Sequence, residues 1–90
     1  MVDRFNVQLS KKAAKELRRL DRPVQDRVVK ALALLRDHPR PAAVTALTGH
    51  PGYLRVRIGD YRIVYTVNDG LLLVLVLTIG HRRSVYDSLT

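Results

Sequence analysis

Two turn signals in the second half of the chain constrain its fold more than any other feature. Gly59-Asp60 and Asp69-Gly70 each lie between apolar runs, and such pairs are typical of two-residue hairpin turns. They divide this part of the chain into three predicted strands, at about residues 53–58, 61–67 and 71–79. The sequence therefore predicts an antiparallel meander. Its last run, LLLVLVLTI, does not alternate, which favours a central strand covered on both faces.

The first 37 residues predict one strand and two helices. Phe5, Val7 and Leu9 alternate with polar residues, as in a half-buried strand. Ser10 follows at the position of a helix N-cap, and a second helix begins near Pro23. Both predicted helices carry apolar residues on one side, namely Ala13, Leu17 and Leu20 in the first and Val24, Val28, Ala31, Leu32 and Leu35 in the second. A tight connection between two amphipathic helices predicts an antiparallel pair.

Residues 38–52, HPRPAAVTALTGHPG, are rich in proline and glycine and predict a loop within one domain that spans residues 1–90. The strands after this loop need the helices before it to cover their apolar face. The predicted fold is therefore α+β, with the order β-α-α-β-β-β. The two-helix antiparallel pair packs on a mostly antiparallel four-stranded sheet.

Composition narrows the classes of function. A net charge of +8 favours a polyanionic partner such as nucleic acid, the ribosome or an acidic protein. Without cysteine, disulfides and thiolate metal sites are excluded, and we expect neither a cofactor nor a metal. No apolar leader is recognisable at the N-terminus, and the run at residues 71–79 is too short to span a bilayer as a helix. We expect a soluble, cytoplasmic protein without a membrane partner.

The first predicted hairpin places arginines on one face of the sheet. With Gly59-Asp60 as the turn, Arg57 faces Arg62, and Arg55 lies two residues back on the same side. Opposed arginines repel, which favours an anionic ligand. Two other interpretations remain open, since the arginines are also able to keep an outer face solvated or to pair with a carboxylate of Asp60, Asp69 or Asp87.

The C-terminal segment GHRRSVYD adds His81, Arg82, Arg83 and Tyr86 just after the predicted central strand. Arginine, histidine and tyrosine, without a carboxylate pair or metal ligands, suit cleavage of RNA by its own 2′-hydroxyl. That reaction needs a base, an acid and cations that stabilise charge on the phosphate. Tyr86 is able to stack on a base or to pack within the protein. Tyr61 and Tyr65 are predicted to be packing residues, and His38 and His50 receive no role.

These stretches resemble the RelE/ParE superfamily of bacterial toxins from toxin–antitoxin modules. The likeness rests on YLRVRIGDYRIVY, the apolar strand after it and GHRRSVYD, and it extends to ALTG and the basic helical portion. It implies a RelE-like fold. For the RelE branch, which the paired arginines and terminal tyrosine favour, it implies ribosome-dependent cleavage of messenger RNA in the A site.

The resemblance also implies roles for single residues. Arg62 matches the phosphate-stabilising arginine, Arg82 the C-terminal arginine, and Tyr86 the tyrosine that orients the target nucleotide. Arg55 and Arg57 fall where some members carry lysines, and arginine is a poor base. Histidine is the residue type whose ordinary pKa lies near neutrality, which makes His81 the candidate for proton transfer. The expected catalytic residues are Arg62, Arg82, His81 and Tyr86, and the expected phosphate-binding residues are Arg55, Arg57 and Arg83.

The resemblance leaves a second branch open, in which a ParE-like toxin acts on DNA gyrase without nuclease activity. A third reading is a nucleic-acid-binding module without catalysis, which the lack of a recognisable helix-turn-helix disfavours. In the favoured branch the expected partners are the ribosome, messenger RNA and a cognate RelB-like antitoxin. Operator DNA is expected as a partner of the toxin–antitoxin complex only.

Overall fold

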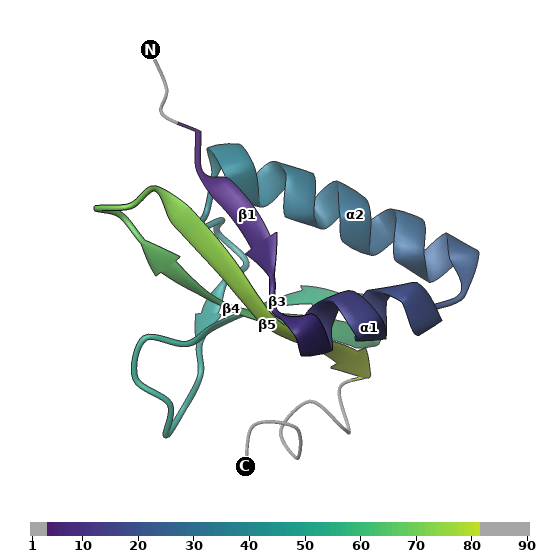
Figure 1. The fold of residues 1–90 in the computed structure, drawn as a ribbon. Coiled ribbons are helices and arrows are strands. Elements are labelled where there is room, and N and C mark those ends of the chain that lie inside the picture. Colours follow the sequence, from purple (N-terminus) through teal and green to yellow (C-terminus); the bar gives the residue numbers. More distant parts are fainter. Residues whose placement is uncertain (1–3, 82–90) are drawn as a thin grey trace.

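The computed structural model describes residues 4–81 and contains two helices and five strands (Figure 1). The elements in chain order are β1 (Asn6–Leu9), α1 (Lys11–Arg19), α2 (Arg22–Asp37), β2 (Thr45–Ala46), β3 (Leu54–Ile58), β4 (Tyr61–Asn68) and β5 (Leu73–His81). Figure 1 shows α1 and α2 meeting at a short connection and running back along each other on one side of the sheet. The predicted α+β fold with its helix pair is confirmed.

The sheet has five strands in the order β1-β5-β4-β3-β2, so the prediction of four strands was wrong. β1 runs parallel to β5, whereas the other neighbouring pairs are antiparallel. The additional strand, β2, pairs Thr45 with Arg55 and Ala46 with Leu54. Two residues inside a proline-rich and glycine-rich loop are too short to show an alternating pattern, so the sequence carried no strand signal there.

The two hairpins differ from each other in how well their turns were predicted. At the first, Ile58 pairs with Tyr61, which leaves Gly59-Asp60 as a two-residue turn with Gly59 at a φ of +58°. At the second, Asn68 pairs with Leu73, so the loop has four residues, and the predicted two-residue Asp69-Gly70 turn was wrong. The Asn68 side chain accepts a hydrogen bond from the Leu71 N–H, which stabilises the wider loop.

The main core lies between the helices and the sheet. Its buried residues come from both helices and three strands: Ala13, Val28, Leu32, Leu35, Val56, Ile63, Tyr65, Val74, Val76 and Ile79. The apolar side predicted for α2 faces this core. In the described part of the chain, neither helix is long and apolar enough to cross a membrane.

The other face of the sheet carries a smaller apolar cluster. Leu47 and Val64 are buried there, and Tyr53 and Leu77 pack against them. The loop between α2 and β3 therefore covers part of this face, while the helices cover the opposite one (Figure 1). β5 is thus sandwiched as predicted, and it lies between β1 and β4.

Beyond the end of β1, side chains of α1 and of its N-cap residue form hydrogen bonds with β5. Ser10 donates to the Leu77 carbonyl at 2.9 Å, and its hydroxyl accepts from the Ala13 N–H at 3.0 Å, as expected of an N-cap. The carboxylate of Glu16 then accepts hydrogen bonds from the Ile79 N–H at 3.0 Å and from the Thr78 hydroxyl at 2.8 Å. These contacts fix α1 against the strand that leads to the C-terminal segment.

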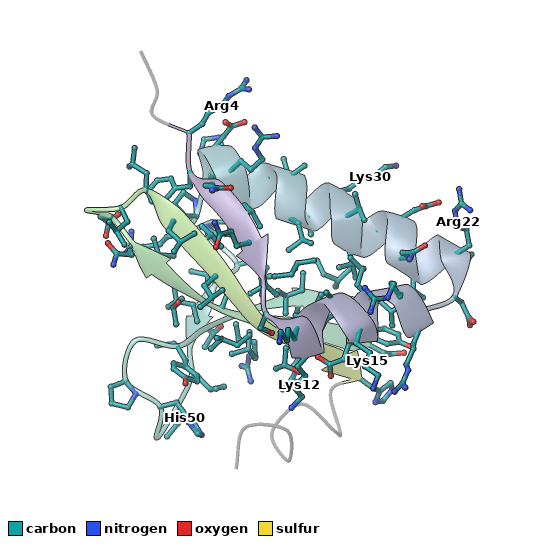
Figure 2. All side chains as sticks on the ribbon, in the orientation of Figure 1. Arg4, Lys12, Lys15, Arg22, Lys30 and His50 are labelled. Atoms are coloured by element: carbon teal, nitrogen blue, oxygen red, sulfur yellow. The ribbon has the colours of Figure 1, made fainter. Side chains whose placement is uncertain are left out.

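Positive charge covers the outer surface of the helices. In Figure 2, Arg22 and Lys30 extend away from α2, and Lys12 and Lys15 lie on α1. All four are exposed. The arginines of β3 and β4 belong to the sheet instead, so the net charge of +8 is divided between at least two surfaces.

The buried Tyr65 predicts a stability change in alkaline solution. Its hydroxyl donates to the Pro39 carbonyl at 2.7 Å, and burial raises its pKa from near 10 to about 12 against the opposing effect of Arg40. The stabilisation is complete below pH 10 and is lost between about pH 10 and 12, because the unfolded state ionises first. We expect a loss of about 2 to 3 kcal/mol from this group over that range. Between about pH 10 and 12, the free energy of unfolding measured in urea should depend less on pH for Tyr65→Phe than for the wild type. An identical slope in the two proteins would contradict this assignment.

Candidate nucleic-acid interface

A row of arginines lies on the sheet face opposite the helices. Val56 belongs to the helix-side core, and because side chains alternate along a strand, its neighbours Arg55 and Arg57 point to the other face. Arg57 pairs directly with Arg62 on β4, as predicted. Arg62 in turn pairs with Gly80 on β5, which has no side chain of its own to place beside the guanidinium group.

The local electrostatics of this row favour an anion. Opposed like charges on neighbouring strands destabilise a sheet by up to about 1 kcal/mol, so a phosphate between them relieves repulsion as well as forming new bonds. Arg57 is exposed, and its Nε donates to the Gly59 carbonyl at 3.3 Å. Arg62 is half-buried and its Nε is buried, so its side chain is less exposed than that of Arg57.

One carboxylate that the sequence offered to these arginines is engaged elsewhere. Asp69 accepts a two-pronged contact from Arg40, with Nη1 to Oδ1 at 3.0 Å and Nη2 to Oδ2 at 2.9 Å. These hydrogen bonds lower the pKa of Asp69. Arg55 lies next in the row, between Thr45 on β2 and Val64 on β4, and is half-buried. Asp69 therefore does not neutralise the row of Arg55, Arg57 and Arg62.

The structure does not bring His81 into this row. His81 pairs with Tyr61 across β4 and β5, and their rings meet edge to face with centroids 5.7 Å apart. Tyr61 pairs with Ile58, which packs on the helix-side core. Because side chains alternate along a strand, Ile58, Tyr61 and His81 belong to the helix side of the sheet, whereas Arg57, Arg62 and Gly80 belong to the other side. His81 is exposed at the end of β5. The other expected site residues, Arg82, Arg83 and Tyr86, lie outside the described residues 4–81.

Sequence reasoning missed an aromatic pair in the loop before β3. The rings of His50 and Tyr53 stack with centroids 5.5 Å apart and planes at 22°. The signal was HPGY, since proline and glycine at the centre of a turn bring the first and fourth residues together. Tyr53 precedes Arg55 by two residues and therefore lies on the arginine face of the sheet.

Two further features of the described residues 4–81 bear on what they are able to bind. They contain no group of three or more histidine or acidic residues placed to hold a metal ion. An open pocket of about 450 Å³ lies away from the arginine row, at the start of β1 and the end of α2. It is lined by Arg4, Phe5, Asn6, Val7 and Arg36.

Comparisons with known proteins converge on one group. A family model for the ParE toxin of the type II toxin–antitoxin system parDE matches residues 7–86. A curated RelE-like toxin protein of Escherichia coli is 30% identical over 81 residues, which cover 89% of this chain and 85% of that protein. The isolated E. coli RelE toxin superposes with a TM-score of 0.75 at 30% identity, covering 96% of this chain and 94% of that one. A chain of the RelBE2 toxin–antitoxin complex of Mycobacterium tuberculosis superposes with a TM-score of 0.79 at 25% identity, covering 88% of this chain and 99% of that one.

Proposed function

This chain belongs to the RelE/ParE superfamily and is the toxin of a type II toxin–antitoxin system, and from that premise we propose that it is a ribosome-dependent messenger RNA endoribonuclease. It cleaves messenger RNA without a metal or cofactor and thereby inhibits translation. The observation that carries the proposal is the opposed pair Arg57 and Arg62 beside Gly80.

The proposed chemistry is an attack by the 2′-hydroxyl of the RNA on its own phosphodiester. The 2′-oxygen loses its proton and bonds to phosphorus, the 5′-oxygen leaves with a proton, and a 2′,3′-cyclic phosphate forms. Charge accumulates on the phosphate oxygens, and a guanidinium group grips two of them in a fixed geometry. Arg62 and Arg82 have this role, Arg55, Arg57 and Arg83 bind neighbouring phosphates, and Tyr86 orients the target nucleotide.

His81 is proposed to transfer a proton in this reaction. It is exposed and lies one residue beyond Gly80, so it approaches a bound phosphate from the end of β5 rather than from within the arginine row. We expect His81→Ala to reduce the single-turnover cleavage rate on ribosomes by about 100-fold, since positioned acids and bases contribute at least that much. His81→Ala cleaving at the full rate would remove the residue from the scheme.

The proposed reaction is tested with purified chain, free of antitoxin, added to translating ribosomes. Primer extension on the messenger should reveal cuts within codons that depend on both the toxin and the ribosome. A supercoiling assay with DNA gyrase runs beside it. Intact messenger together with blocked supercoiling would transfer the protein to the gyrase-inhibiting branch.

A ParE-like gyrase inhibitor remains the second candidate, because the matching family model is that of the ParE toxin. In that function the arginine row is a docking surface and performs no chemistry. Arg62→Ala then weakens gyrase inhibition through binding alone, and no RNA product appears under any condition.

The proposed partners follow from the same family. Several structurally similar proteins were solved as toxin–antitoxin complexes, including RelE–RelB of Pyrococcus horikoshii, at a TM-score of 0.77 and 28% identity. We propose that a cognate RelB-like antitoxin neutralises this chain in the cytoplasm. Operator DNA is then bound by the toxin–antitoxin complex, and messenger RNA on the ribosome by the free toxin. The +8 charge of the chain supports binding to both nucleic acids, operator DNA and messenger RNA.

A further inference from the structure

We propose that the stacked rings of His50 and Tyr53 form a platform on which a base of the messenger, flanking the cleaved phosphodiester, is held. The inference rests on the proposed function, because it assigns a further subsite to the same single-stranded RNA.

The loop that carries the platform is built from two consecutive turns. The His50 N–H donates to the Leu47 carbonyl at 3.3 Å, and the Tyr53 N–H donates to the His50 carbonyl at 3.0 Å. Gly49 and Gly52 take the third position of each turn with φ near +80°, a conformation that favours glycine. The Leu47 N–H closes the segment by donating to the Tyr53 carbonyl at 2.9 Å. The backbone positions that carry the two rings are therefore fixed by hydrogen bonds before any ligand arrives.

The same loop is anchored on the arginine face. Leu47 is 6% exposed and packs with Val64 and Tyr53 on the side of the sheet away from the helices. Tyr53, Arg55 and Arg57 then follow at alternate positions, which spans about 13 Å along a strand. An aromatic side chain thus stands in line with two cations. This is the combination that single-stranded nucleic acids bind, bases on rings and phosphates on arginines.

The surroundings of the rings leave room for a base. Within the described residues 4–81, no atom outside the adjacent residues lies within 4 Å of where a Cβ would stand on Gly49 or on Gly52. Figure 2 shows His50 at the outer part of the loop, away from both helices. The His50 side chain is partly exposed and its ring stacks on Tyr53, so we place the base against the exposed part of this pair.

The test is direct binding of a short single-stranded oligoribonucleotide that contains 2-aminopurine, whose fluorescence is quenched when it stacks. Each of its sugars carries a 2′-O-methyl group, so no 2′-hydroxyl is free to attack a phosphate and the oligoribonucleotide cannot be cleaved. Wild-type protein should quench the probe on binding. Tyr53→Leu, which keeps apolar bulk against Leu47, and His50→Ala should each raise the dissociation constant about 10-fold and abolish most of the quenching.

Leu71→Ala is the matched control, because Leu71 is 70% exposed and lies in the β4–β5 loop. It should bind and quench as the wild type does. Absence of quenching with wild type, or unchanged affinity and quenching in both His50→Ala and Tyr53→Leu, would overturn the platform. The platform and the nuclease proposal fail in different ways. If the probe is quenched but the messenger on ribosomes stays intact, only the proposed chemistry is wrong. If the messenger is cleaved but the probe is not quenched, only the platform is wrong.

Discussion

Replacing Arg62 with alanine is expected to slow messenger cleavage on ribosomes by at least about 100-fold. Removing one donor that stabilises charge in a transition state costs about 3 kcal/mol, which corresponds to that factor. Arg62 stands between Arg57 and Gly80 on the neighbouring strands, and neither Arg55 nor Arg57 of β3 occupies this central position. Single-turnover cleavage of a messenger with a defined A-site codon measures the effect.

The matched control for this prediction is Arg57→Ala, which removes the opposed and more exposed guanidinium group. We expect a smaller effect there, of about 10-fold, because an exposed arginine loses more freedom when it binds. Arg57→Ala should not lower the melting temperature, since its side chain is exposed and its removal relieves repulsion between like charges. A thermal melt of Arg62→Ala separates a loss of rate from a loss of folded protein. If Arg62→Ala cleaves as fast as the wild type, the arginine row has no role in the chemistry.

Replacing Glu16 with alanine is expected to lower the free energy of unfolding by about 3 kcal/mol. The Glu16 carboxylate is the acceptor for the Ile79 N–H and for the hydroxyl of Thr78, which is 1% exposed. Alanine leaves these donors without their acceptor at the edge of β5. For a domain of this size the loss should lower the melting temperature by more than about 10 °C.

Glu16→Gln is the control, because an amide oxygen still accepts from the Ile79 N–H. We expect it to cost only about 1 kcal/mol, the difference between a charged and a neutral acceptor. Urea unfolding of the three proteins orders them as wild type, glutamine and alanine. A loss below about 1 kcal/mol for alanine would show that α1 is held mainly by its apolar side.

The meander, the helix pair and the arginine opposition were predictable because each depends on local patterns. Alternating residues around Gly59-Asp60 fixed the register of the first hairpin, and Ser10 marked a helix start. The bonds from Glu16 to β5 were not predictable, because the residues lie 62 and 63 positions apart and a lone glutamate on a helix has no pattern.

The side of the sheet on which His81 lies is set by a single β-bulge in β5. Tyr65 pairs with Val76, yet its neighbour Val64 pairs with Thr78, so Leu77 is an extra residue in β5. With regular pairing, Arg62 would face Ile79 and His81 would share the arginine side of the sheet. The bulge moves every later residue of β5 to the alternate side. A run of leucine and valine carries no signal of such a bulge, so the sequence alone placed His81 with the arginines.

The most direct measurement of the central claim uses purified ribosomes stalled with a defined codon in the A site. The messenger ends are mapped after adding the wild-type chain, and the chemistry of the new 3′ end is determined. The account predicts a cut within that codon that requires the ribosome and leaves a 2′,3′-cyclic phosphate. Intact messenger from a folded protein that still arrests growth when produced in cells would contradict it.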